Sequence, residues 1–153
     1  MASESLCTVA PSGPPQALPS RVVLFDGVCV FCEAVVRWLI ERDPQARLRF
    51  ATLQGETAAV LRRAHPEIPE ELATLVYVAA NEGDEDVSLR SEAAFRVLAQ
   101  IEGPWRSLAW LGRLPRWCTD PAYRLFVCHR YRIFGKRSEC LVPSSAEHSR
   151  FLD

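Results

Sequence analysis

The chain lacks any apolar run close to the roughly 20 residues that a transmembrane helix needs, so its sequence predicts no membrane span. It begins Met-Ala-Ser-Glu-Ser, without the basic and apolar stretches of a secretory signal, so we expect a cytoplasmic protein. It also lacks an excess of basic charge, because the net charge is −1, which argues against a general nucleic-acid binder. With 153 residues, 48% of them hydrophobic, the chain suits one globular domain.

Internal repeats are absent, and so is the glycine spacing of a dinucleotide-binding loop, because Gly27 stands alone. We therefore expect no cofactor, and electrons for a redox reaction would come from another protein or a small thiol. The chain does contain six cysteines. In a reducing compartment they indicate redox chemistry, metal binding or plain burial rather than a disulfide framework.

The first part of the chain has the pattern of a strand–helix–strand unit. Residues 22–25 form an unbroken apolar run of strand formers, typical of a strand buried on both faces. The helix that follows has four apolar residues at helical spacing on one face: Phe31, Val35, Trp38 and Leu39. Asp43-Pro44 ends this helix, and residues 48–53 return to strand character. The connection is long enough for a right-handed parallel crossover.

A second helix at 56–65 and a β-hairpin come next. The hairpin pairs residues 75–79 with residues 87–89 across an acidic turn at 81–86. Together these elements predict an α/β core built from a βαβ unit and a β-hairpin.

The C-terminal part is predicted to be a helical extension of this core. Ser91 is the expected N-cap of one helix, and residues 105–114 form a shorter one. Asp120-Pro121 has the arrangement that opens a helix, and this last helix stops at Gly135.

The most informative segment is Asp26-Gly27-Val28-Cys29-Val30-Phe31-Cys32, which places two thiols three positions apart at the start of a helix. Free N–H groups and a partial positive charge at a helix N-terminus favour a thiolate. Cys29 is nearer that end and is the expected attacking thiol, while Cys32 can resolve the mixed disulfide. The competing interpretation is that both cysteines are small buried residues that fill space.

The sequence resembles the DCC family of thiol–disulfide oxidoreductase-like proteins, which is named for an Asp-x-x-Cys-x-x-Cys motif. Asp26, Cys29 and Cys32 occupy the motif positions. Further similar segments follow in order: Ser91-Glu92-Ala93, the stretch around Trp105, Tyr123, Arg130-Tyr131-Arg132-Ile133-Phe134-Gly135 and Cys140. The resemblance implies a thioredoxin-like fold and assigns Cys29 and Cys32 as the redox pair. The expected organisation is one domain between two tails: 1–20, 21–143 and 144–153.

One feature departs from the wider thioredoxin pattern, in which a cis-proline precedes the strand facing the C-x-x-C pair. Here Ala73-Thr74 stands before that strand. The cis-proline keeps metals off the thiols, so its absence leaves room for metal binding, with Cys140 or His129 as further ligands. The cysteine spacings nevertheless match no common zinc framework, and our main expectation is a site without metal.

Two other groups have alternative roles. Asp26 could pass protons to and from the cysteine pair, or it could accept backbone N–H bonds in the turn. Residues 104–137 carry eight basic side chains and one acidic one. Within this block Arg130 or Arg132 could face Cys29, to stabilise its thiolate or to hold an anionic substrate. The alternative is that the block is a solvated helix face.

The sequence as a whole predicts a thiol–disulfide oxidoreductase of the protein-disulfide reductase type. Its expected substrate is a disulfide-containing protein or a small thiol compound, and neither nucleic acid nor a membrane is an expected partner. Cys118 and Cys128 are expected to be buried. The alternatives are a metal-binding module and a redox-silent module that binds a partner through its basic face.

Overall fold

The computed structural model describes residues 19–70, 74–81, 84–136, 138, 145 and 147–152. Within these residues a mixed sheet has the strand order β2-β1-β3-β4. The strands are β1 (Arg21–Phe25), β2 (Arg49–Thr52), β3 (Val76–Asn81) and β4 (Asp84–Leu89). The helices are α1 (Val30–Glu41), α2 (Glu56–Ala64), α3 (Arg90–Leu98), the 3-10 helix η1 (Pro104–Arg113), α4 (Arg116–Phe134) and the 3-10 helix η2 (His148–Arg150).

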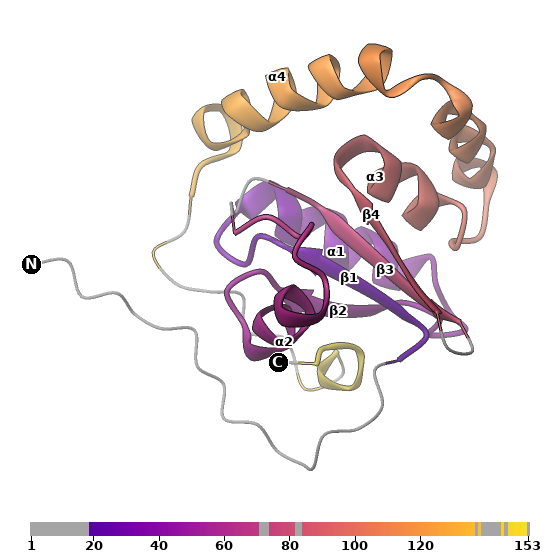
Figure 1. Cartoon of the computed structure of the whole chain (residues 1–153), viewed down its shortest axis with the longest axis vertical. Helices are drawn as coiled ribbons and strands as arrows, with labels where there is room; N and C mark the ends of the chain where they lie inside the picture. Colours follow the sequence, from indigo (N-terminus) through magenta and orange to yellow (C-terminus); the bar gives the residue numbers. More distant parts are fainter. Residues whose placement is uncertain are drawn as a thin grey trace, which may run out of the picture.

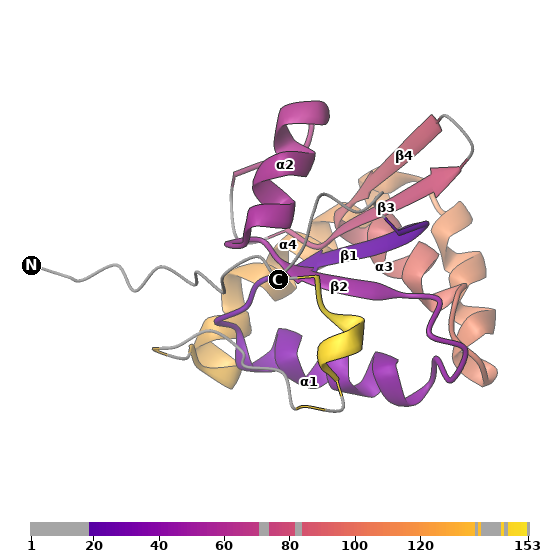
Figure 2. The same cartoon turned by 90° about the horizontal axis from the view of Figure 1, so that it is seen from below.

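Strand β1 lies in the middle of the sheet and is covered on both faces (Figure 2). It runs parallel to β2 and antiparallel to β3. Val23 and Phe25 point to the face packed by α1 and α3, while Val22 and Leu24 point to the face packed by α2. Because successive strand residues face opposite sides, a strand buried on both faces needs an unbroken apolar run.

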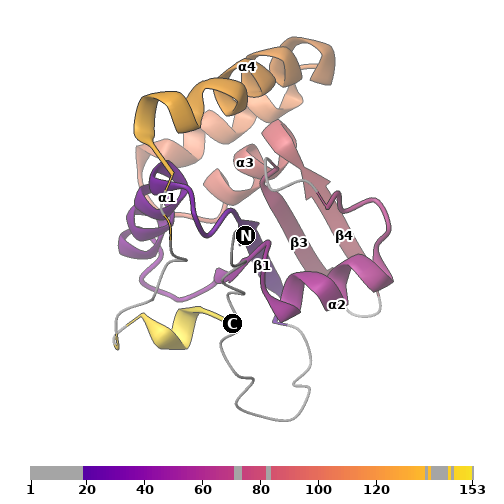
Figure 3. The ribbon, with the colours of Figure 1, turned by 90° about the vertical axis from the view of Figure 1, so that its left-hand side faces the viewer.

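Helices η1 and α4 form an outer layer beyond α1 and α3 (Figures 1 and 3). α4 reaches the start of α1 through Phe126 and Phe134, whose ring centroids each lie 4.8 Å from that of Phe31. Gly135 ends α4 with a φ of 84°, a left-handed conformation that glycine adopts without steric penalty. The C-terminal helix is thereby held beside the N-terminus of α1.

The predicted strand–helix–strand unit and hairpin are confirmed, and the α/β core with its C-terminal helices is that of a thioredoxin-like fold. The hairpin is longer than expected, because β3 continues to Asn81 and β4 begins at Asp84. Backbone pairing across the hairpin therefore extends into the acidic segment that the sequence assigned to a turn.

Two predicted helix starts are wrong. α3 begins at Arg90, and the Ser91 hydroxyl does not cap it but donates to Asp120 Oδ1 at 2.7 Å. α4 begins at Arg116 rather than at Asp120, and it contains Pro121. A proline this close to a helix N-terminus removes one backbone hydrogen bond but leaves the long C-terminal part of the helix intact.

Residues 147–152, which the sequence places in a tail, contact the core. Phe151 packs against Phe25 and Phe50, with ring centroids 6.2 and 6.0 Å away. The backbone N–H of Leu152 donates to the carbonyl of Phe50 at 2.9 Å. Residues 1–18 of the predicted N-terminal tail lie outside the described part of the chain.

Candidate redox site

The turn after β1 brings the first motif residue into the protein interior. Asp26 follows β1 directly and is 1% exposed. Gly27 is required at the next position, because a Cβ there would lie 2.9 Å from Thr52 Cγ2 and 3.3 Å from Gln54 Oε1. Its backbone N–H instead donates to Gln54 Oε1 at 3.1 Å. The close approach of this turn to the end of β2 fixes the direction in which the chain enters α1.

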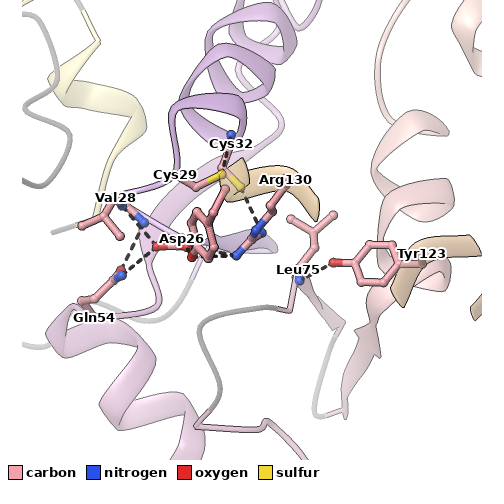
Figure 4. A network of polar contacts seen from close by, with 10 residues as sticks. Asp26, Val28, Cys29, Cys32, Gln54, Leu75, Tyr123 and Arg130 are labelled. Carbon is pink, nitrogen blue, oxygen red and sulfur yellow. Dashed lines mark hydrogen bonds and ion pairs between the residues drawn. The ribbon is translucent and has the colours of Figure 1, made fainter. Parts of the chain in front are cut away.

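Cys29 is the N-cap of α1 and is only 1% exposed. Its Sγ accepts the backbone N–H of Cys32 at 3.4 Å (Figure 4). The sulfur therefore occupies the position where a capping oxygen normally satisfies a free N–H group. The Cys29 backbone also forms a bridge with that of Lys136, just beyond α4. Cys29 thus caps the helix with its sulfur and is almost completely buried in this conformation.

Cys32 lies one helical turn further on and is half-buried. Its Sγ accepts a hydrogen bond from Arg130 Nη1 at 3.4 Å. Burial and, to a smaller extent, the hydrogen bond with the neighbouring Cys29 raise the pKa of the Cys32 thiol to about 12, while the positive charge of Arg130 acts in the opposite direction. Cys32 is therefore a protonated thiol near neutral pH, and no disulfide joins it to Cys29 in this structure.

Asp26 and Arg130 form a buried ion pair beside the two cysteines. Arg130 Nη2 lies 3.0 Å from Asp26 Oδ2, and the two side chains are 5% and 0% exposed. Asp26 Oδ1 accepts the Val28 N–H at 3.1 Å and Gln54 Nε2 at 2.9 Å (Figure 4). The hydroxyl of Tyr131 also donates to Asp26. A buried carboxylate needs such a set of partners, because removing an ion from water costs several kcal/mol, by a rough estimate.

A cavity of about 320 Å³ opens beside this pair, between α1, α3 and α4. Most of its wall is apolar, including Phe31, Val35 and Val127. Polar groups on its wall come from Asp26, Cys32, Thr74, Tyr123 and Arg130. Cys29 does not line it. The cavity therefore gives a small or extended molecule access to the Cys32 side of the motif.

The structure brings together four of the five residues singled out from the sequence: Asp26, Cys29, Cys32 and Arg130. Arg132 is exposed and does not line the cavity. Two positions apart on a helix, Arg130 and Arg132 point in widely different directions. Only the side chain on the inner face of α4 can reach the cysteines.

The other candidate cysteines, and His129, are not found at the Cys29–Cys32 site in the described part of the chain. Cys118 and Cys128 are exposed, not buried, because they lie on the outer side of α4. His129 is exposed, and its Nδ1 contacts the carbonyl of Leu125 in its own helix. Cys140 and Ala73 lie outside the described residues. In the described ranges, no cluster of three or more His, Cys, Asp or Glu side chains could hold a metal ion.

Sequence reasoning missed Gln54 and Tyr131, both of which hold Asp26. Gln54 could have been found, because it follows β2, and the ends of parallel neighbouring strands meet at one edge of a sheet. Tyr131 had no comparable signal. Its contact depends on how α4 is rotated against the core, which is set by packing between distant segments.

A mixed sheet of this order, with a C-x-x-C pair at the start of its first helix, defines a thioredoxin-like fold. The sequence model of the family described as DCC1-like thiol-disulfide oxidoreductase matches residues 23–136. The chain belongs to this family.

Two curated proteins illustrate how far the similarity extends. The chain is 34% identical over 137 residues to the "Uncharacterized protein YuxK" of Bacillus subtilis (strain 168), covering 90% of this chain and 97% of that protein. It is 30% identical over 120 residues to the "DCC family protein At1g52590, chloroplastic" of Arabidopsis thaliana, covering 78% of this chain and 67% of that protein. No solved structure matches the chain.

Proposed function

We propose that the protein is a thiol–disulfide oxidoreductase that works as a disulfide reductase through Cys29 and Cys32. The observation that carries the proposal is the placement of both thiols at the N-terminus of α1, beside the buried pair of Asp26 and Arg130. The family to which the chain belongs supports the same class of reaction. The direction of electron flow and the roles of single residues are part of the proposal.

In the first step, Cys29 as a thiolate attacks one sulfur of a substrate disulfide. A Cys29–substrate mixed disulfide forms, the substrate S–S bond breaks, and one substrate thiolate leaves and takes up a proton. The capping position of Cys29, where its Sγ accepts an N–H bond, supports its role as the attacking group. Because Cys29 is only 1% exposed and does not line the cavity, substrate reaches this sulfur after a local movement of the chain.

In the second step, Cys32 loses its proton and attacks Cys29 Sγ in the mixed disulfide. A Cys29–Cys32 disulfide forms, and the second substrate thiol is released. The net change is the reduction of one substrate disulfide to two thiols by the protein dithiol, which becomes a disulfide. An external dithiol or a partner protein then restores the reduced pair. The raised pKa of Cys32, about 12, supports this division, because a resolving cysteine stays protonated until it is needed.

Arg130 and Asp26 assist the second step in this proposal. Arg130 donates to Cys32 Sγ and stabilises negative charge there. Asp26 positions Arg130 through their ion pair and accepts the proton that Cys32 releases. Arg132 takes no part, because its side chain is exposed away from the cavity.

The cavity beside Cys32 does not reach Cys29, and we propose that it holds the part of the substrate next to the reacting disulfide. Its volume of about 320 Å³ and its mainly apolar wall suit a small disulfide or the side of an extended peptide, not a folded surface. The substrate range should therefore be narrow. Metal binding, the first alternative, would need a ligand outside the described residues, because those residues form no cluster that could hold a metal.

A redox titration with mapped alkylation tests the proposal. Metal-free protein is equilibrated in dithiothreitol or glutathione buffers of defined potential, then alkylated and analysed by mass spectrometry. We expect Cys29 and Cys32 to interconvert as one two-electron couple between about −270 and −120 mV. Exposed Cys118 and Cys128 serve as internal controls that stay alkylated throughout. If the pair never forms a disulfide, the proposed function is wrong.

Trapping experiments separate the roles of the two thiols. A Cys32→Ser variant should accumulate a stable mixed disulfide at Cys29 when it is given a small disulfide. A Cys29→Ser variant should form one far more slowly at Cys32, because that thiol is protonated at neutral pH. If Cys32 is trapped faster, the roles of the two residues are reversed.

A further inference from the structure

The outer side of η1 and α4 exposes large apolar side chains that the redox site does not use. We call this surface the outer face; its members are Trp110, Leu114, Trp117 and Leu125. Trp110 is 61% exposed, Trp117 77% and Leu125 65%. Single exposed apolar residues are ordinary on a protein surface, but a run of tryptophan and leucine along one layer marks an interaction site.

α4 is apolar on two sides, and only one of them packs against the protein. Tyr123, Val127 and Arg130 on its inner side line the cavity. Trp117, Pro121 and Leu125 recur every four residues and share the opposite, exposed side. In the described part of the chain nothing covers this second side.

The charge carried by η1 and α4 themselves is almost entirely positive. Arg106, Arg113, Arg124 and Arg132 are exposed, and in the described ranges none of them forms an ion pair. The single acidic residue of 104–137 is Asp120, whose carboxylate accepts the Ser91 hydroxyl at 2.7 Å. A partner that fits this surface must therefore carry both negative charge and apolar groups.

We propose, contrary to the expectation from the sequence that a membrane is not a partner, that the outer face of η1 and α4 docks on an anionic lipid surface. Tryptophan is the side chain that prefers the membrane–water interface, and arginines beside it add attraction to anionic headgroups. A helix with these two features lies in the interface without crossing it. None of the described helices is long and apolar enough to span a bilayer, so the contact is peripheral. A second copy is a poorer occupant, because two positive faces would repel each other.

Vesicle flotation of the full chain tests this inference in the presence of reductant, which keeps exposed Cys118 and Cys128 from cross-linking. The probes are vesicles of phosphatidylcholine alone and vesicles with about 30% phosphatidylserine. We expect the protein to float with the anionic vesicles, to bind neutral ones at least about tenfold more weakly, and to be released by roughly 0.5 M salt.

Variants assign the binding to the outer face. The double variant Trp117→Ala/Leu125→Ser should lower the partition coefficient at least about tenfold. Replacing Arg124 and Arg132 by glutamine should lower it about fivefold per arginine on anionic vesicles. Val60→Ser is the matched control, because Val60 is 47% exposed on α2 and lies outside the outer face. Circular dichroism confirms that each variant is folded.

Two results would overturn the inference. Absence of binding to both vesicle types removes the lipid surface as the occupant. A concentration-dependent dimer in sedimentation, lost in Trp117→Ala/Leu125→Ser, assigns the face to a second copy instead. Thiol chemistry enters neither readout, so the outcome is independent of the proposed function.

Discussion

The two ends of helix α1 each carry a buried aspartate–arginine pair that ties a late part of the chain to the core. Before α1, Asp26 pairs with Arg130 of α4 at 3.0 Å. After α1, Asp43 pairs with Arg150 of η2 at 2.6 Å. In both pairs the residues are about 100 positions apart in sequence, so each pair closes a large loop.

The surroundings of the two pairs differ. Asp43 accepts the backbone N–H groups of Arg47 and Leu48 at 3.1 and 2.8 Å, and Arg150 also donates to the Asp43 carbonyl at 3.1 Å. That arrangement holds the turn after α1 and ties η2 to it. The Asp26 pair has a thiol as a further partner, since Arg130 donates to Cys32, and it borders a cavity. A buried ion pair is thus weak evidence of function by itself, and its reactive neighbour makes the difference.

The largest expected effect is the loss of stability when either aspartate loses its arginine partner. Arg150→Met and Arg130→Met each leave an aspartate buried without its charged partner, so each should lower the free energy of unfolding by about 3–5 kcal/mol. Urea denaturation measures this loss. Unchanged stability in either variant would show that the corresponding aspartate is held by its other hydrogen bonds alone.

A smaller effect tests how tightly the turn between β1 and α1, which carries Asp26, packs against the end of β2. Gly27→Ala places a Cβ 2.9 Å from Thr52 Cγ2, and the turn must shift to relieve the contact. We expect a loss of about 1–3 kcal/mol in the free energy of unfolding, as for other overpacked sites. Slower disulfide formation by Cys29 and Cys32 should accompany it. Wild-type values for both quantities would contradict the close approach at this turn.

The rate at which Cys32 is alkylated should distinguish the Asp26–Arg130 pair from the Asp43–Arg150 pair. Because burial raises its pKa to about 12, its alkylation rate should rise about tenfold per pH unit between roughly pH 8 and 11, without a plateau. Arg130 lowers that pKa, so Arg130→Met should slow the reaction by about tenfold at a given pH. Arg150→Met is the matched control and should leave the rate unchanged. Mass spectrometry of the Cys32 peptide over time gives these rates, and a plateau near pH 8 would contradict the burial of the thiol.

The smallest effect concerns a partly exposed pair that belongs to neither end of α1. His65 contacts Glu85 and Glu67, and the hydrogen bond to Glu85 is the main cause of its raised pKa. A raised pKa in the folded state stabilises the protein below the ordinary histidine pKa, and this stabilisation is lost as pH rises through the folded value. His65→Gln should therefore cost less than about 1 kcal/mol, and only in acid. Denaturation at pH 5.5 and pH 8.5 measures the difference; an equal loss at both would contradict it.

The sequence predicted those elements whose formation depends on the pattern of apolar residues over a short stretch of chain. The apolar run before Asp26 and the helical spacing after it identified β1 and α1, and the motif located both cysteines. The choice between Arg130 and Arg132 could not be made, because it depends on the rotation of α4 against distant segments. Arg150 was missed for the same reason, since its partner Asp43 lies 107 positions away.

The exposure of Cys118 and Cys128 also depends on how α4 packs against the core, and it too could not be predicted from the sequence. Burial is the common fate of a free cysteine, so Cys118 and Cys128 were expected inside. They are exposed because α4 has a second apolar side that the described core does not cover. Composition predicts how much of a chain is apolar, whereas the arrangement of helices decides which apolar residues reach the core.

The most direct test of the account is the rate at which Cys32 resolves a mixed disulfide at Cys29. Reduced wild-type protein, Arg130→Met and Arg150→Met would be mixed with a small aromatic disulfide and followed by stopped flow, under conditions where all three are folded. We expect the attack of Cys32 on the mixed disulfide to slow about tenfold or more in Arg130→Met and to keep the wild-type rate in Arg150→Met. Equal rates in the two variants would contradict the claim that the Asp26 pair, and not the Asp43 pair, serves the thiols.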